Sequence, residues 1–212
     1  FIFQDCFHFR GKDEPITFKI KGSKNWTPHN FSNKYSGNIT LKWALMLSKN
    51  VVAARLADRV GPDSVLETAR RFGITVPKTP HMSVALGAIE ISPLEIASAF
   101  ATFASSGIYH EPTVIRRVED ISGNILFQSK DQQKRVWEDT QTLSLLIDML
   151  QGVTKEGTAK KITRSGFSHP VIGKTGTTNN YKDSWFIGAL PDVSTSVWVG
   201  FDRTRSMITR KG

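Results

Sequence analysis

Three short apolar runs near the C-terminus constrain the fold of this 212-residue chain more than any other feature. They occupy residues 170–177, 184–190 and 196–201, and each has the length and the composition of a strand. The breaks between them are short and polar, and contain residues 179–183 and Pro191-Asp192. Short breaks of this kind favour antiparallel neighbours, so the sequence predicts an antiparallel meander at this end of the chain.

The residues that precede these runs are mainly helical in pattern. Ser92 has the features of an N-cap, because Pro93 follows it and Glu95 lies three residues later. Apolar faces at helical spacing recur in several other stretches. They predict helices over residues 41–46, 51–60, 63–72 and 142–153. Alternating residues predict a small hairpin over 114–127 and a short strand over 16–20.

The order of these elements predicts an α+β fold, with a helical subregion followed by an antiparallel sheet. We expect a single partial domain over residues 1–212. Residues 1–38 form its irregular first segment, residues 39–153 its mainly helical part, and residues 154–212 its strands.

Composition excludes several classes of protein. The chain is 39% hydrophobic and 22% charged, which is ordinary for a folded soluble domain. Its net charge of +9 attracts polyanions, but the basic residues lack interleaved aromatic residues, so a solvated basic face is favoured over a nucleic-acid site. Cys6 is the only cysteine, and no run of about 18 apolar residues occurs. The five histidines match no metal-ligand spacing, and we expect no metal and no cofactor: His8, His29, His81, His110 and His169.

The segment Gly-Lys-Thr-Gly-Thr-Thr (173–178) carries the clearest chemistry. On a strand, Lys174 and Gly176 share one face while Thr175 and Thr177 share the other, and a twist or bulge at an edge lets Thr175 also reach a ligand. Gly176 leaves room for a substrate backbone. The Lys174 ammonium and the Thr177 N–H suit a carboxylate and a developing oxyanion, as acyl transfer requires.

Two other interpretations of this segment exist. One is an ordinary Thr-rich strand with a bulge glycine. The other is a phosphate-binding loop, because Gly173-Lys174-Thr175 copies its end, but Ser168 stands where that loop needs its first glycine. A turn and a strand follow the Lys-Thr pair in place of the required helix, so we reject the phosphate loop.

Ser48-Lys49-Asn50 lies between two predicted helices. A hydroxyl beside an amide and an ammonium can relay a proton and hold a substrate amide. A serine in this position is more often a helix cap than a catalyst, so this segment alone is weak.

In combination the segments resemble the transpeptidase domain of class A penicillin-binding proteins, the bifunctional enzymes of peptidoglycan synthesis. Ser-x-Asn and Lys-Thr-Gly, with a Ser-x-x-Lys element, form the signature set of penicillin-binding proteins and class A β-lactamases. The matching blocks follow in order through most of the chain: Trp-Thr-Pro-His-Asn (26–30), 37–41, 44–50, 85–95, 100–107, Gly-Thr-Ala (157–159), 173–179, 183–188, Pro191 and 197–202.

The resemblance implies a D,D-transpeptidase that cross-links peptidoglycan stem peptides through an acyl-serine intermediate. It implies that Ser48 relays a proton to the leaving group and that Asn50 holds the amide of the donor peptide. Lys174 would tune this network, while the hydroxyls of Thr175 and Thr177 would bind the terminal carboxylate beside Gly176 and the Thr177 N–H would complete the oxyanion hole.

The chain departs from the family in one respect. No serine here has a lysine three residues later, so the Ser-x-x-Lys nucleophile is expected upstream of Phe1. We therefore expect the domain to be truncated at both ends. We also expect that this chain alone forms no acyl-enzyme, because it lacks the serine that would be acylated. A serine β-lactamase of the same fold and a non-catalytic wall-binding scaffold remain as alternatives.

The resemblance also implies partners and a location. The partners are stem peptides on the lipid-linked precursor polymer and β-lactam antibiotics, with no nucleic acid. The parent would be a membrane-anchored bacterial protein with an upstream glycosyltransferase domain, on the periplasmic or extracellular side of the cytoplasmic membrane.

Overall fold

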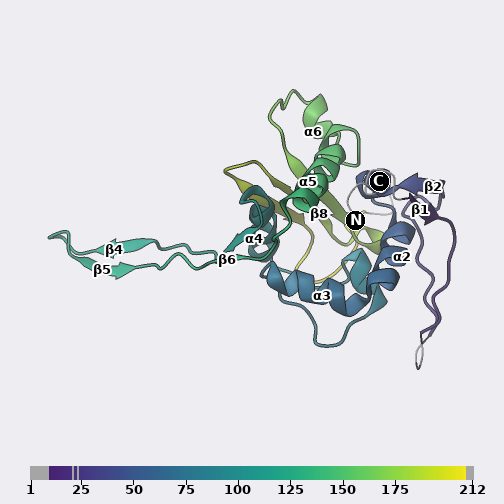
Figure 1. Ribbon diagram of the computed structural model, residues 1–212, viewed down its shortest axis with the longest axis horizontal. Coiled ribbons are helices and arrows are strands. Elements are labelled where there is room, and N and C mark those ends of the chain that lie inside the picture. Colours follow the sequence, from purple (N-terminus) through teal and green to yellow (C-terminus); the bar gives the residue numbers. More distant parts are fainter. Residues whose placement is uncertain (1–9, 21, 23, 209–212) are drawn as a thin grey trace.

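A computed structural model describes residues 10–20, 22 and 24–208 of the chain. Within them, helices pack on a small antiparallel sheet, as the α+β prediction requires (Figure 1). The helices are α1 (Leu41–Met46), α2 (Asn50–Val60), α3 (Pro62–Arg71), α4 (Pro93–Ala104), α5 (Thr140–Lys155) and α6 (Lys161–Arg164), with 3₁₀ helices η1 (Met82–Leu86) and η2 (Asn179–Tyr181).

The strands form one three-stranded sheet and three two-stranded ribbons among the described residues. The sheet has the order β7-β8-β9, in antiparallel pairs, so the C-terminal meander is confirmed. Pairs β1-β2, β3-β6 and β4-β5 form the ribbons. The bounds are β1 (Arg10–Asp13), β2 (Gly37–Thr40), β3 (Ile108–His110), β4 (Arg117–Glu119), β5 (Ile125–Gln128), β6 (Gln133–Arg135), β7 (Ile172–Thr177), β8 (Ser184–Ala189) and β9 (Ser194–Val199).

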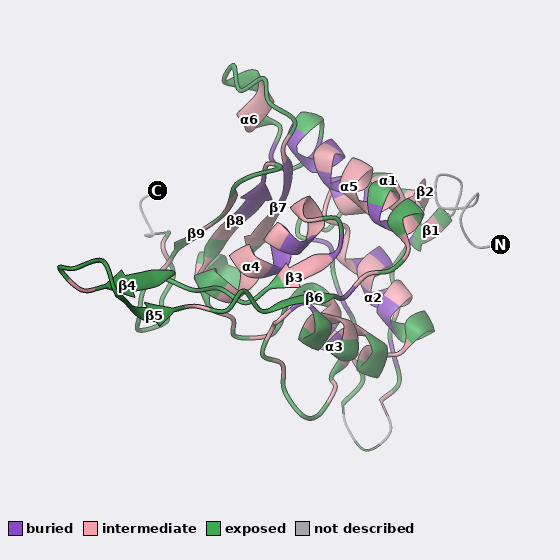
Figure 2. Cartoon of the chain, turned by 60° about the vertical axis from the view of Figure 1, so that its left-hand side comes forward, coloured by how far each residue is buried: buried purple, intermediate pink, exposed green. Residues whose placement is uncertain are grey.

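The main core lies where α4 and α5 cover the sheet. Helix α5 packs on β7, and α4 packs on β8 and β9. Figure 2 shows buried residues gathered at this contact and along α2. Burial of this apolar surface fixes the helices against the strands, at roughly 25 cal/mol for each Å² removed from water. The core cluster consists of Phe100, Leu150, Ile172, Ile187 and Ala189.

Side chains cap the N-termini of α4 and α5. The Ser92 side chain accepts a hydrogen bond from Glu95 N, and the Glu95 carboxylate accepts one from Ser92 N, so the predicted capping box is confirmed. Asp139 caps α5 by accepting from Gln141 N and Thr142 N. These caps set where each helix begins and hence which side chains it directs at the sheet.

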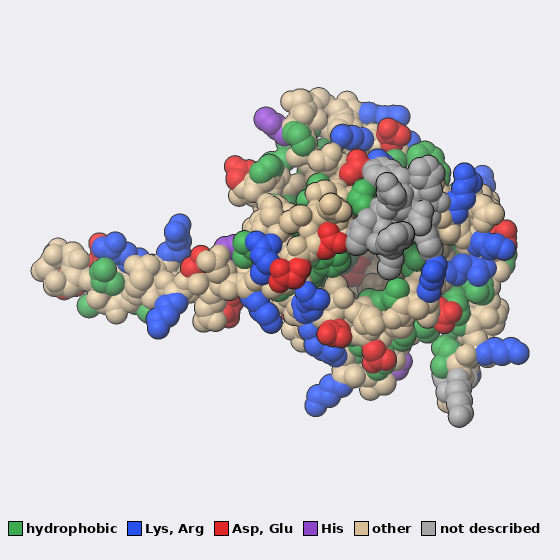
Figure 3. All heavy atoms as spheres, in the orientation of Figure 1, with side chains coloured by type: hydrophobic (Ala, Val, Ile, Leu, Met, Phe, Trp, Pro, Cys, Tyr) green, Lys and Arg blue, Asp and Glu red, His purple; other side chains and the backbone are tan. Residues whose placement is uncertain are grey.

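The predicted hairpin over 114–127 is also confirmed. Strands β4 and β5 form a ribbon that projects far from the body of the molecule (Figure 1) and is exposed along its length (Figure 2). Lys and Arg side chains lie along it and over the body with Asp and Glu among them (Figure 3), in line with a solvated basic surface.

The N-terminal part differs from the sequence prediction. The strand expected over residues 16–20 is wrong, because only a single bridge between Phe18 and Trp26 forms there. Strand β1 lies instead within the segment expected to be irregular, and β2 crosses from that segment into the part expected to be mainly helical. Their side chains carry no clean alternation of apolar and polar residues, so the pattern did not reveal them.

Two features are absent from the described residues. None of the helices there is both long and apolar enough to cross a membrane. The same residues contain no group of three or more His, Cys, Asp or Glu that could hold a metal ion. Cys6 and His8 lie outside the described part of the chain.

Candidate active site

Lys174 joins the strand that carries Lys-Thr-Gly to the turn that carries Ser-x-Asn. It lies on β7, directly across from Ile187 of β8, and therefore on the face of the sheet that α4 and α5 cover. Its Nζ donates a hydrogen bond to Ser48 Oγ at 2.7 Å and another to the carbonyl oxygen of Thr175 at 2.8 Å. The predicted meeting of Ser48 and Lys174 is thus present, across 126 residues of sequence.

The position of Lys174 between sheet and helices changes its acidity. Burial disfavours the charged ammonium and lowers its pKa from 10.5 to about 8. A lysine with this pKa gives up and regains a proton near neutral pH far more readily than an exposed one. Because its Nζ touches the hydroxyl of Ser48, the pair can pass a proton between them.

Ser48 is held in an unusual backbone conformation. Helix α1 ends at Met46, and Ser48 then adopts φ 52°, in the left-handed region. Hydrogen bonds from Ser48 N to Leu45 O (3.0 Å) and from Lys49 N to Ala44 O (2.8 Å) close the turn. A non-glycine residue in this region costs on the order of 1–3 kcal/mol and persists only where its surroundings hold it.

Asn50 is the first residue of α2 and is half-buried. Its Nδ2 donates to the carbonyl oxygen of His29 at 2.9 Å, which fixes the direction of the side chain. One Nδ2 hydrogen and the Oδ1 atom are left for other partners, because an amide carries two donors and an acceptor. Its role toward a peptide amide stays a prediction.

Thr177 and Gly176 lie at the open edge of the described sheet. Thr178 N donates to Asp183 O on the β8 side, and neighbouring strand residues direct their N–H groups to opposite sides. The Thr177 N–H therefore points to the edge that β8 does not cover, and its side chain is exposed. This is the direction that an oxyanion donor needs.

Thr175 has a partner that the sequence did not suggest. Its Oγ1 shares a hydrogen bond of 2.7 Å with Thr158 Oγ1. A twist or a bulge was expected to bring Thr175 to a ligand. The register of β7 and β8 runs without a slip from Ile172 to Thr177, so no bulge is formed there. A ligand that binds the Thr175 hydroxyl would either replace the hydrogen bond to Thr158 or bind both hydroxyls.

Thr158 is placed by a close contact between helices. Its N donates to Met46 O at 3.1 Å, which ties the end of α5 to the end of α1, two residues before Ser48. Gly157 permits this approach, because a Cβ there would lie 2.5 Å from Met46 O. The Gly-Thr-Ala block matches the family in sequence, but only the fold reveals that Thr158 contacts the Lys-Thr-Gly strand.

A surface hollow of about 380 Å³ lies beside this region and is separate from the contact of Ser48 with Lys174. It contains Trp43 and Met46 from α1 with Asp148 and Gly152 from α5. None of the site residues predicted from the sequence lines it. We assign the chemistry to the residues around Lys174, where the hydrogen bonds and the shifted pKa coincide.

Comparison with known proteins agrees with this geometry. The sequence model of the family described as "Penicillin binding protein transpeptidase domain" matches residues 12–203. Penicillin-binding protein 1A of Aquifex aeolicus is 38% identical over 184 residues, which are 87% of this chain and 25% of that protein. The corresponding protein of Neisseria gonorrhoeae is 37% identical over 202 residues, or 92% of this chain and 25% of its own length.

Solved structures give the same result. The crystal structure of penicillin-binding protein 1A from Haemophilus influenzae aligns with a TM-score of 0.83 and 28% identity, over 91% of this chain and 34% of that one. The PonA1 protein of Mycobacterium tuberculosis in complex with penicillin V aligns with a TM-score of 0.75 and 25% identity, over 96% of this chain and 57% of that one.

The chain spans about a quarter of the length of the curated relatives it matches. The match to the family covers nearly all of it, and the Ser-x-Asn and Lys-Thr-Gly elements meet as the family requires. The chain belongs to the transpeptidase domain family of the penicillin-binding proteins.

Proposed function

We propose that the full-length protein containing this chain is a D,D-transpeptidase that cross-links peptidoglycan stem peptides. The observation that carries this proposal is the 2.7 Å contact between Lys174 Nζ and Ser48 Oγ, made by a lysine whose pKa burial lowers to about 8. A proton can move along this pair at neutral pH, which acyl transfer from an amide needs.

The proposed reaction has two steps. A serine outside residues 1–212 attacks the carbonyl carbon of the penultimate D-Ala, and the bond to the terminal D-Ala breaks. Ser48 passes a proton to the departing amine and regains one from Lys174, which in turn recovers its proton from the hydroxyl of the attacking serine. The amine of a neighbouring stem peptide then attacks the acyl-serine and forms the cross-link, and the proton that it gives up returns to the oxygen of the departing serine.

The remaining residues bind and orient the peptide. The Thr177 N–H stabilises the oxyanion, at a typical value of about 3 kcal/mol for such a donor. The Thr175 and Thr177 hydroxyls bind the terminal carboxylate, Asn50 holds a peptide amide, and Gly176 lets the peptide backbone approach. No metal or cofactor takes part in this scheme. β-Lactams acylate the same serine as substrate mimics. A relative, the PonA1 protein of Mycobacterium tuberculosis, has been solved in complex with penicillin V.

We also propose the location. The relatives are penicillin-binding proteins 1A. The stem peptides that the proposed reaction cross-links lie outside the cytoplasmic membrane. The parent is then anchored in that membrane with this domain on its outer side and a glycosyltransferase domain upstream.

The test uses the purified full-length protein. Fluorescent penicillin should label it covalently, and lipid-linked precursor should yield cross-linked product. Ser48→Ala should lower both rates by at least about tenfold, since it removes the proton relay. The matched control is Ser165→Ala, because Ser165 is an exposed serine whose hydroxyl donates only to Ile162 O at the end of α6.

Three results would contradict the proposal. Rapid hydrolysis of nitrocefin would instead assign a β-lactamase. Binding of peptidoglycan with no covalent label would assign a scaffold. Equal rates for Ser48→Ala and Ser165→Ala would remove Ser48 from the reaction.

A further inference from the structure

A buried ion pair lies directly behind Ser48. Asp13, on β1, is fully buried, and its Oδ2 lies 2.7 Å from Lys49 Nζ, whose side chain is only 10% exposed. Ser36 N also donates to Asp13 Oδ2 at 2.9 Å. Lys49 is the residue between Ser48 and Asn50, so this pair anchors the middle of the Ser-x-Asn segment.

Asn30 extends the pair into a network. Its Nδ2 donates to Asp13 Oδ1 at 2.6 Å and to Lys34 O at 3.0 Å, while its Oδ1 accepts from Val51 N at 3.3 Å. Val51 lies in the first turn of α2, which has no side-chain cap of its own. Asn30 therefore serves as the cap of α2 from 21 residues away in the sequence.

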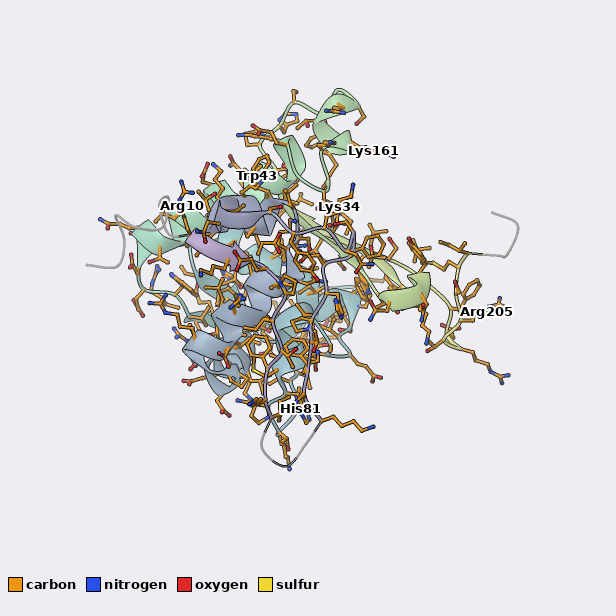
Figure 4. The ribbon with its side chains drawn as sticks, turned by 90° about the vertical axis from the view of Figure 1, so that its right-hand side faces the viewer. Arg10, Lys34, Trp43, His81, Lys161 and Arg205 are labelled. Carbon is orange, nitrogen blue, oxygen red and sulfur yellow. The ribbon has the colours of Figure 1, made fainter. Side chains whose placement is uncertain are left out.

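The network holds the backbone on the far side of Ser48. Lys49 Nζ also donates to Lys34 O at 3.3 Å, and the neighbouring Asn50 is tied to His29 O. Figure 4 looks onto this side of the molecule and labels Lys34. The helix α1 fixes Ser48 from one side and this network fixes it from the other, which is the support that its left-handed conformation needs.

Electrostatics keeps the network intact. Burial alone would raise the pKa of Asp13, but the hydrogen bonds from Lys49 and Asn30 outweigh it and leave the pKa lowered. The carboxylate is therefore charged at neutral pH. A buried charge that loses its partner is strongly unfavourable, so Lys49 cannot move away from Asp13 without a large penalty.

We propose that Asp13 is a positioning residue of the active site, which through Lys49 and Asn30 holds the 48–50 turn so that Ser48 Oγ rests on Lys174. This inference builds on the proposed function. It goes beyond it because Asp13 lies outside the Ser-x-Asn and Lys-Thr-Gly motifs and would act only through the residues that it holds.

The experiment compares Asp13→Asn with Val136→Ala in the full-length protein. Val136 is equally buried but belongs to the separate cluster of Phe72 and Ala99, so its truncation destabilises the domain without touching the network. The first readout is the rate of acylation by fluorescent penicillin, measured well below the melting temperature of each variant. We expect Asp13→Asn to slow acylation by at least about tenfold, since small misplacements of catalytic groups have effects of this size.

The second readout needs no activity. Competitive acetylation of lysines at increasing pH, resolved by peptide mass spectrometry, reports the pKa of Lys174. In Asp13→Asn we expect it to rise from about 8 toward 10.5, because a displaced Ser48 admits water to the ammonium. In Val136→Ala the pKa of Lys174 should be unchanged.

Lys49 variants cover the case in which Asp13→Asn fails to fold. Lys49→Arg keeps an ion pair with Asp13 and should retain acylation within about threefold, whereas Lys49→Met should lose at least about tenfold. Equal rates for these two variants would overturn the inference, as would equal effects of Asp13→Asn and Val136→Ala.

The experiments distinguish a failure of the proposed transpeptidase function from a failure of the positioning role of Asp13. If the wild-type protein is not acylated at all, the proposed function is wrong, and the acetylation experiment still decides the positioning role. An unchanged Lys174 pKa in Asp13→Asn would then reject it.

Discussion

Lys174 is the residue whose chemistry depends most on its place in the fold, since burial sets its pKa and Ser48 receives its hydrogen bond. We predict that Lys174→Ala lowers the acylation rate of the full-length protein by at least about tenfold, because a preorganised charge is lost. Stopped-flow measurement with a penicillin substrate gives the rate. The control is Lys155→Ala, which removes an exposed lysine whose Nζ donates to Gln151 Oε1. Unchanged kinetics in Lys174→Ala would exclude Lys174 from the site.

The same residue links stability to pH. The pKa of Lys174 is about 8 in the fold and 10.5 without burial, so the unfolded chain binds more protons between these values and folding is favoured as pH rises. Relative to Lys174→Met, we expect the wild-type domain to gain roughly 3 kcal/mol of unfolding free energy between pH 7 and pH 11. Urea unfolding of both proteins across this range measures the difference. Parallel pH profiles would show that Lys174 is not desolvated.

Prediction from the sequence succeeds where a residue acts through a local motif. The Ser-x-Asn and Lys-Thr-Gly motifs, taken together with the resemblance of the surrounding blocks, predict that Ser48 and Lys174 belong to one site, and the two side chains meet in the fold. The sequence does not assign Asp13 and Thr158, because their roles come from contacts with segments distant in the sequence. A buried aspartate in a short polar strand leaves no pattern that distinguishes it from a surface residue.

Among the elements, those with strong local signals are predicted well. The capping box of α4 and the strands β7, β8 and β9 follow from caps, breaks and apolar runs. The strand expected over 16–20 fails because its alternation has no neighbouring strand to pair with, apart from the bridge of Phe18 to Trp26. Pairing is a tertiary property, so alternation alone cannot decide it.

The contact between the ends of α1 and α5 yields a prediction for an element. In Gly157→Ala, the added Cβ would lie 2.5 Å from Met46 O and 2.7 Å from Val153 Cα, so backbone must shift. We expect a loss of about 1–3 kcal/mol in stability and slower acylation, since Ser48 follows the end of α1 by two residues. Thermal unfolding and penicillin labelling measure the two effects.

Gly123→Ala is the control for this change. Gly123 also gains backbone strain, at φ +83°, but nothing lies within 4 Å of the added Cβ, and the residue sits at the tip of the projecting hairpin. It should label at the wild-type rate. Normal labelling of Gly157→Ala would mean that the α1–α5 contact does not control Ser48.

For the whole molecule, the proposed active site is built from segments that lie far apart in the sequence. In that proposal the helical part supplies Ser48 and Asn50, the sheet supplies Lys174 and Thr177, and the N-terminal ribbon supplies Asp13, which pairs with Lys49. None of these segments forms a site alone. The order of motifs along the sequence is enough to predict the α+β fold, while the distances between the parts require the folded chain.

The segments present in a protein also determine whether it can be acylated by penicillin. No serine of this chain is followed three residues later by lysine, so it lacks the pair that the family uses as nucleophile and base. We predict that residues 1–212, produced alone and incubated with penicillin, show no stoichiometric mass increase by intact mass spectrometry, whereas the full-length protein gains one penicillin. Ser48 is present in the isolated chain and in the full-length protein, and its hydroxyl accepts a hydrogen bond from Lys174. Any adduct on the isolated chain should therefore be mapped first at Ser48. An adduct mapped to Ser48 in the isolated chain would show that Ser48 is itself a nucleophile, and its assignment as a proton relay would be wrong.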